Sequence, residues 1–190
     1  MSKRFIVDKT FQRIDYNASE LIKGEYDNCL FEDCVFANTN ISDSAFSDCE
    51  FKNCDLSLVK LINTSFKDVR FTNCKLLGLH FNECNKFGFE IDFSSCLLNL
   101  SSFYKMNLKN LKFINCTLHE VDFTEANLSD LVLENCDLSG ALFDNTILEK
   151  TDFRSSFSYA IDPEKNRIKK AKFSMSGVIG LLSKYDIVIE

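Results

Sequence analysis

The sequence predicts a repeat fold of the solenoid class, and two runs with the same period carry this prediction. In the first run, every fifth residue from position 93 to position 153 is Phe or Leu. A period of five matches neither the 3.6-residue period of a helix nor the two-residue period of a strand, so it indicates a repeated structural unit. The run consists of Phe93, Leu98, Phe103, Leu108, Phe113, Leu118, Phe123, Leu128, Leu133, Leu138, Phe143, Leu148 and Phe153.

The second run has the same period in another register and precedes the first. It consists of Phe11, Tyr16, Leu21, Tyr26, Phe31, Phe36, Ile41, Phe46, Phe51, Leu56, Leu61, Phe66, Phe71, Leu76 and Phe81. The twelve positions from Phe81 to Phe93 amount to two repeats and two extra residues. The chain therefore contains one array of repeats, interrupted once at residues 82–92.

Individual units resemble the pentapeptide-repeat family, whose consensus is A-(D/N)-L-x-x. Residues 126–130 read Ala-Asn-Leu-Ser-Asp and residues 136–140 read Cys-Asp-Leu-Ser-Gly. The resemblance extends over about residues 11–157. It implies an all-β fold, a right-handed quadrilateral β-helix in which four units form one coil. The central residue i and the small residue i−2 then point inward, and residues i−1, i+1 and i+2 point outward.

The cysteines test this geometry without an alignment. All nine lie two positions before a central position, where a small and readily buried residue is expected. Two triplets with a spacing of twenty residues, Cys34, Cys54 and Cys74 and then Cys96, Cys116 and Cys136, are expected to stack on successive coils. We therefore expect nine free thiols rather than disulfides or metal ligands, since the CxxC and Cys/His spacings of zinc sites are absent from the sequence.

The chain divides into three parts. Residues 1–10 are a short polar lead-in, residues 11–159 form the β-helix, and residues 160–190 form a C-terminal cap with a short helix predicted over 175–184. Within the interruption, Lys86 occupies an apolar slot. We expect Phe87 or Phe89 to fill that slot through a bulge, with Gly88 supplying backbone freedom.

The cap carries more apolar side chains than a terminal coil needs as a lid. They are Met175, Val178, Ile179, Leu181 and Leu182. Exposed apolar patches often mark interfaces, and two-fold dimers are the commonest assemblies. We therefore predict a homodimer formed through residues 160–190.

Enzyme activity is not expected, and neither is a cofactor or a metal. Both histidines, His80 and His119, fall on outward positions without a nucleophile or metal partner at a recognisable spacing. Known catalytic motifs and phosphate-binding loops are absent from the sequence. An N-terminal apolar signal region and an apolar run of eighteen residues are also absent, which favours a cytoplasmic protein without a membrane span.

The acidic residues are unevenly distributed. Residues 120–152 hold nine acids and one lysine, in a chain with a net charge of −6. By repeat position, six of these acids should project outward, namely Asp122, Glu125, Asp130, Glu134, Asp137 and Asp144. They either keep the rod soluble or form an anionic surface for a cationic partner, and the sequence leaves both readings open. Direct nucleic-acid binding is not expected, because nearly all the Phe rings belong to the core.

Two further segments resemble the McbG-, MfpA- and Qnr-like members of the family, which protect type II topoisomerases. They are residues 161–168, Ile-Asp-Pro-Glu-Lys-Asn-Arg-Ile, and residues 58–62, Leu-Val-Lys-Leu-Ile. This resemblance implies a DNA-mimicking protein that binds DNA gyrase or topoisomerase IV and confers resistance to quinolones or immunity to a gyrase-poisoning toxin. The chain lacks the long loops of Qnr proteins. The alternative is a generic interaction rod with another partner.

Overall fold

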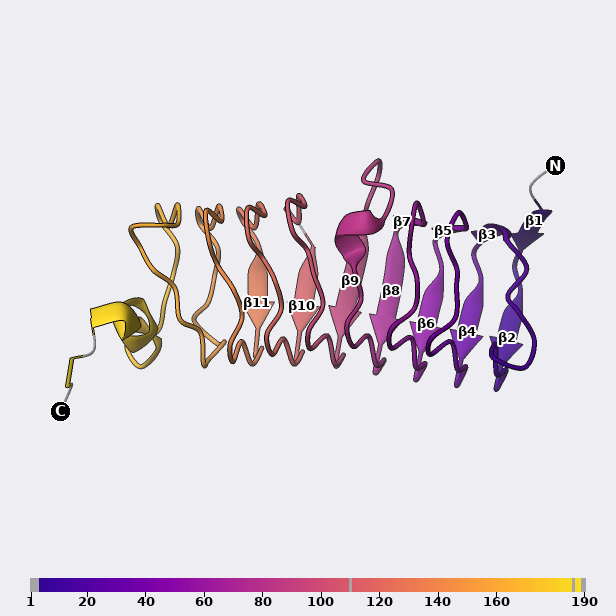
Figure 1. Ribbon diagram of the computed structural model, residues 1–190, viewed down its shortest axis with the longest axis horizontal. Coiled ribbons are helices and arrows are strands. Elements are labelled where there is room, and N and C mark those ends of the chain that lie inside the picture. Colours follow the sequence, from indigo (N-terminus) through magenta and orange to yellow (C-terminus); the bar gives the residue numbers. More distant parts are fainter. Residues whose placement is uncertain (1–3, 110, 186, 189–190) are drawn as a thin grey trace.

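The computed structural model describes residues 4–109, 111–185 and 187–188 and is a parallel β-solenoid whose coils stack along one axis (Figure 1). The strands are β1 (Arg4–Val7), β2 (Thr10–Gln12), β3 (Gly24–Asp27), β4 (Leu30–Glu32), β5 (Ala45–Ser47), β6 (Glu50–Lys52), β7 (Ser65–Lys67), β8 (Val69–Thr72), β9 (Ile91–Ser94), β10 (Lys112–Ile114) and β11 (Val132–Glu134). Short 3-10 helices are η1 (Phe81–Glu83), η2 (Gly177–Leu181) and η3 (Ser183–Tyr185). Within the described residues, no helix has the length and apolar character needed to cross a membrane.

The strand register confirms the four-unit coil. Phe31 pairs with Phe51 and Phe51 with Phe71, so residues twenty apart lie side by side on parallel strands. Across the interruption Phe71 pairs with Phe93, a separation of 22, which confirms the two extra residues. Because twenty residues hold four five-residue units, each coil has four sides.

The four sides are named here by their central residues. The seven-stranded face, with strand order β11-β10-β9-β8-β6-β4-β2, holds Phe11 and its equivalents. The next face along the chain is the Tyr16 face, with Tyr16 and its equivalents up to Leu138, followed by the Leu21 face, with Leu21 and its equivalents up to Phe143. The four-stranded face, with order β1-β3-β5-β7, holds Tyr26 and its equivalents up to Leu148.

The predicted central residues form the core. All of them are buried except Phe11, which is partly exposed because it lies in the first coil. On the seven-stranded face the rings stack at centroid distances of 4.7–4.8 Å from Phe11 through Phe31 and Phe51 to Phe71. This distance equals the usual spacing between paired strands, so the strand pairing that sets the distance between backbones also sets the distance between the rings.

The residues at i−2 do more than fill a small space. The Cys54 thiol donates to the Phe31 carbonyl at 3.4 Å, and the Thr151 hydroxyl donates to the Leu128 carbonyl at 2.7 Å. Each bond gives a buried side chain a partner on the preceding coil, and the Leu128 carbonyl also accepts from the Leu131 N–H at 3.2 Å. All nine cysteines are buried and free, as the sequence predicts.

Left-handed backbone at the i+2 positions turns the chain at the corners. Among the residues that the structure describes, 24 non-glycine residues have a positive φ, and most of them are Asn or Asp. These side chains tolerate the left-handed region better than other residues do. They also link coils, since Asn73 donates to Asn53 and Asn53 donates to Asp33 at 2.8 and 3.1 Å.

The interruption forms a loop that rises above the rod between β8 and β9 (Figure 1). Of the two candidates for the apolar slot, Phe89 packs against the core, with its ring 6.3 Å from that of Phe81. Phe87 is 91% exposed, so the alternative expectation for Phe87 was wrong. Gly88 has a φ of +67°, which fits the expected need for backbone freedom.

Both ends of the rod extend beyond the expected array. Residues 4–7, expected in the lead-in, form β1 and pair with β3. At the other end, Asp152 bridges Lys172 and the Phe153 ring stacks on Phe173 at 5.3 Å. The predicted cap helix consists of η2 and η3. Residues 1–3 of the lead-in, and Asp186, Ile189 and Glu190 of the cap, lie outside the described residues.

Candidate functional surface

The six predicted acidic residues all project from the rod, but the structure distributes them over four faces. Three lie together on the Leu21 face, namely Asp122, Glu125 and Asp144. Asp130 lies on the four-stranded face, Glu134 on the seven-stranded face and Asp137 on the Tyr16 face. Neighbours in the sequence therefore point in different directions, because each unit of five turns the chain by one side of the square.

Charge differs between the faces. In residues 9–155, the seven-stranded face holds six acids and six Lys or Arg, which gives a net charge of zero. The Tyr16 face holds four acids and one Lys, the Leu21 face six acids and three Lys, and the four-stranded face seven acids and four Lys, so each of these three faces has a net charge of −3. The rod thus presents three acidic faces and one neutral face.

Ion pairs on the neutral face join acids to nearby cations, within one coil or between coils. Glu50 pairs with Lys52 at 2.6 Å and with Arg70 at 3.5 Å, and Asp92 pairs with Lys112 at 3.4 Å. These carboxylates are therefore partly neutralised by cations fixed on the same face. Acids that are paired in this way attract a cationic partner less strongly than unpaired acids do.

Carboxylates on the acidic faces are more available. Within the residues that the structure describes, Glu83, Glu120 and Asp122 form no ion pair. The Asp122 carboxylate accepts hydrogen bonds from the Thr124 backbone N–H at 2.9 Å and from the Ser102 hydroxyl at 3.4 Å. Other acids there are paired, since Glu125 lies 3.3 Å from Lys105. The pairing is thus partial and leaves net negative charge.

The histidines do not form a catalytic group. His119 Nε2 lies 2.8 Å from an Asp137 oxygen, and the other Asp137 oxygen accepts from the Ser139 hydroxyl at 2.8 Å. Partial burial acts to raise the pKa of Asp137, but the hydrogen bonds from His119 and Ser139 outweigh it and hold that pKa below its usual value. His80 is exposed. Across the described residues, no cluster of three His, Cys, Asp or Glu side chains could hold a metal.

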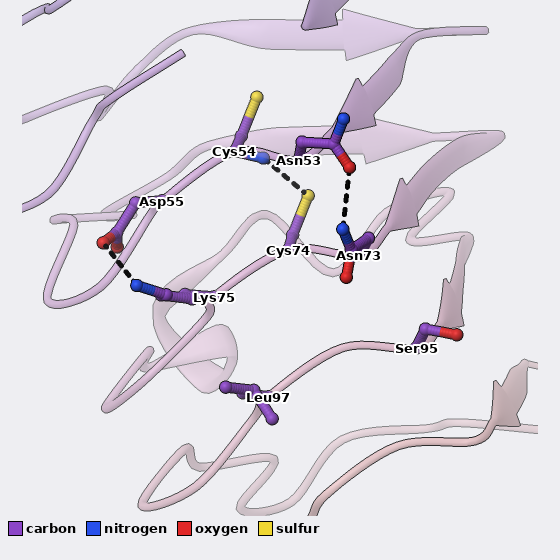
Figure 2. A pocket seen from close by; sticks show the side chains of 8 residues that line it. All are labelled: Asn53, Cys54, Asp55, Asn73, Cys74, Lys75, Ser95 and Leu97. Atoms are coloured by element: carbon purple, nitrogen blue, oxygen red, sulfur yellow. Dashed lines mark hydrogen bonds and ion pairs between the residues drawn. The ribbon is translucent and has the colours of Figure 1, made fainter. Parts of the chain in front are cut away.

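A shallow groove runs along the corner between the seven-stranded face and the Tyr16 face (Figure 2). It is lined by Asn53, Cys54, Asp55, Asn73, Cys74, Lys75, Ser95 and Leu97. Its polar groups bond to one another across coils, as in the contact of the Cys54 N–H with the Cys74 sulfur at 3.4 Å. Both thiols of the groove, Cys54 and Cys74, are buried, so neither is exposed to react with a solute. The groove is a product of coil stacking and offers no reactive group.

The apolar side chains of the cap are only partly covered. Met175, Val178 and Ile179 are exposed, whereas Leu181 packs against the core and Leu182 is half-buried. η2 passes close over Tyr159, because a Cβ on Gly177 would lie 2.0 Å from the Tyr159 hydroxyl oxygen. The cap therefore presents three apolar side chains to solvent, Val178 and Ile179 from η2 and Met175 from the segment before it.

Sequence reasoning missed a second apolar feature, two exposed leucines at i+2 corners of the Tyr16 face. Leu58 and Leu100 occupy i+2 corner positions and are 59% and 61% exposed. The available signal was the residue type, because most of the i+2 corners carry polar residues or glycine.

Comparisons with known proteins agree with the fold. The family profile described as the pentapeptide repeat region matches residues 25–92 and 89–157. A search of curated proteins gave no match. A trypsin-treated variant of QnrB1, a plasmid-mediated fluoroquinolone resistance protein, is 20% identical with a TM-score of 0.58, covering 98% of this chain and 92% of that one. HetL, a pentapeptide repeat protein involved in heterocyst differentiation regulation from the cyanobacterium Nostoc sp. strain PCC 7120, is 13% identical with a TM-score of 0.49, covering 90% and 88%.

Proposed function

Because this chain belongs to the pentapeptide-repeat family, we propose that it is a non-catalytic binding protein that mimics DNA and occupies the DNA-binding groove of a type II topoisomerase. Binding to DNA gyrase or topoisomerase IV would confer resistance to quinolones or immunity to a gyrase-poisoning toxin. The observation that carries the proposal is the net charge of −3 on each of three faces. A groove that binds DNA is cationic, and complementary charge favours its association with an acidic rod.

The charge density sets the strength of the mimicry. About seven coils at roughly 4.8 Å give a rod of ~34 Å. B-DNA of that length carries roughly 20 phosphate charges, since one charge falls on about every 1.7 Å. The three acidic faces hold 17 acids, but 8 lysines reduce their net charge to −9. The number of acids on the rod is therefore close to the number of phosphate charges on DNA, but the net charge of the rod is smaller. Its binding should depend on salt less steeply than DNA binding does.

Two further parts of the proposal concern assembly and location. A homodimer through the exposed Met175, Val178 and Ile179 would lengthen the rod and give it two-fold symmetry, which suits a two-fold enzyme. Light scattering tests this, and a monomer at tens of micromolar would reduce the cap to a lid. The topoisomerase works in the cytoplasm, and we place the protein there.

The charge proposal is tested by reversing acids on one face at a time. The variant Asp122→Lys, Glu125→Lys, Asp144→Lys changes the Leu21 face, and its matched control Glu32→Lys, Asp92→Lys, Glu134→Lys changes the neutral face by the same charge. Gyrase supercoiling is measured with and without a quinolone. Wild-type protein should alter the reaction, the first variant should lose the effect, and the control should keep most of it.

If a molar excess of wild-type protein changes neither supercoiling nor quinolone sensitivity, the topoisomerase proposal fails. The generic interaction rod then takes its place. The fold likeness to HetL illustrates that one architecture carries several roles.

A further inference from the structure

An apolar ridge runs along the corner between the Tyr16 face and the Leu21 face. It consists of Leu58, Leu77, Gly78 and Leu100. Backbone hydrogen bonds place these residues on successive coils, from the Leu58 N–H to the Leu77 carbonyl and from the Gly78 N–H to the Asn99 carbonyl, both at 2.9 Å. Leu58 and Leu100 are exposed, and Leu77 is half-buried between them.

The backbone conformation of the two outer leucines does not contribute to the stability of the fold. Leu58 has a φ of +57° and Leu100 a φ of +63°, and in the described part of the chain no other apolar side chain belongs to a non-glycine residue with a positive φ. A bulky residue is disfavoured in this region, whereas Asn and Asp tolerate it. Since both leucines are also largely exposed, they bury little apolar area in return. A strained and exposed apolar residue is better explained by binding than by stability.

Gly78 shapes the ridge between the leucines. A Cβ at this position would lie 2.8 Å from Cδ2 of Leu58, so the Leu58 side chain leans over the glycine toward the next coil. Any larger residue at 78 would push that side chain away. The three positions together form a low apolar surface rather than isolated side chains.

Most acids of this corner lie on the coils before and after the ridge. The two faces that meet at this corner carry a combined net charge of −6, from ten acids and four lysines. On these two faces, the three coils that carry the ridge hold two acids and three lysines, namely Asp55, Glu83, Lys60, Lys75 and Lys105. Glu120 follows Leu100 in the same column, and within the described residues it forms no ion pair. A partner that fits this corner has an apolar hollow opposite the ridge and Lys or Arg beyond both ends of that hollow, along the axis of the rod.

We infer that the corner between the Tyr16 and Leu21 faces is the docking side of the rod, with Leu58 and Leu100 inserted into an apolar hollow of a basic protein groove. This inference rests on the proposed function, because it takes the topoisomerase groove as the partner surface. The neutral seven-stranded face, which lies opposite the Leu21 face, then points away from the partner. Charge would bring the rod into the groove, and the leucines would fix its rotation about its long axis.

The two contributions respond differently to salt. Attraction between exposed charges is screened over about 8 Å at physiological ionic strength. Burial of apolar surface is not weakened by moderate salt. Removing the leucines should therefore lower affinity by a similar factor at low and high salt, whereas reversing acids should lower it mainly at low salt.

The test uses full-length protein and purified gyrase, with affinity measured by biolayer interferometry in 50 and 300 mM salt. The variant Leu58→Asn, Leu100→Asn should weaken binding at least tenfold in both buffers. It should melt at the same temperature as wild type or higher, because Asn suits a positive φ. The control Val132→Thr removes an apolar group that is 50% exposed on the neutral face and should bind as wild type does.

Two outcomes overturn the inference in distinguishable ways. If the leucine variant binds like wild type while the Asp122→Lys, Glu125→Lys, Asp144→Lys variant does not, the proposed function stands and the ridge is not the anchor. If wild-type protein fails to bind gyrase in either buffer, the proposed function fails and the inference fails with it.

Discussion

Replacing Phe113 by Ala should destabilise the rod more than almost any other single change. Phe113 is fully buried, stacked on Phe93 at 5.0 Å and in edge contact with Phe103 at 5.8 Å and with Phe123 at 6.4 Å. Truncation of a buried aromatic residue to Ala costs about 3–5 kcal/mol. The neighbouring rings belong to continuous stacks, Phe93 with Phe71 and Phe103 with Phe81 and Phe123. These stacks hold the rings in place and resist collapse into the cavity, so we expect the upper half of this range.

Urea denaturation gives the measurement, followed by circular dichroism and by tyrosine fluorescence because the chain has five Tyr and no Trp. Agreement of the two probes would establish a single transition, which a free energy of unfolding requires. The control is Phe87→Ala, which removes the same ring from a position that is 91% exposed and should change stability by less than about 0.5 kcal/mol. A loss below about 1 kcal/mol for Phe113→Ala would refute the argument that the aromatic ladder holds the coils together.

Four other predictions concern single positions. Ellman's reagent should react with none of the nine thiols in the native protein and with all of them in denaturant, since all nine are buried; fast native reaction would contradict this. Thr151→Val removes one of the two hydrogen bonds to the buried Leu128 carbonyl, which keeps the Leu131 N–H as a donor, and should cost about 0.5–1.5 kcal/mol in urea denaturation; a neutral result would mean the bond is unimportant. Gly78→Ala should lower the melting temperature more than Gly88→Ala, because both have a positive φ but only Gly78 has a side chain within 4 Å; equal effects would show that strain alone matters. The pKa of Asp137 is lowered in the folded state, so its carboxylate stabilises the fold above the unfolded pKa of about 3.9, and this stabilisation is lost as pH falls through the lower folded pKa. Asp137→Asn should therefore reduce the free energy of unfolding at pH 7 and change it little at pH 2. An equal reduction at both pH values would exclude a role of the charge.

The fold could be predicted from the sequence because each inward position has a narrow choice of residue. A five-residue apolar period, a cysteine at i−2 and a spacing of twenty are direct consequences of the coil, and the register from Phe31 to Phe51 follows from them. The interruption was harder, because both Phe87 and Phe89 are large enough for the empty slot. Only the backbone path through Gly88 decides that Phe89 turns inward.

The candidate surface was less predictable than the fold. A linear stretch of acids from 120 to 152 suggests one patch, yet Asp130, Glu134 and Asp137 project from three faces. Packing restricts the residue type little at outward positions. The charge of a surface can therefore be judged only after these residues have been assigned to the four faces. The neutral face likewise depends on partners such as Asp92 and Lys112, which stack because twenty residues separate them.

The constant separation of paired residues has a consequence for biosynthesis. Each strand pairs with a segment twenty residues away, or twenty-two across the interruption, and no described pairing joins the two ends of the chain. A coil can therefore close as soon as the next twenty residues have left the ribosome, at about 5–20 residues per second. Synthesis would add one closed coil about every 1–4 seconds onto a template already formed, so that long exposed apolar stretches never accumulate in the nascent chain. Because each pairing spans one coil, whole coils can be added to or removed from the rod without a change in topology.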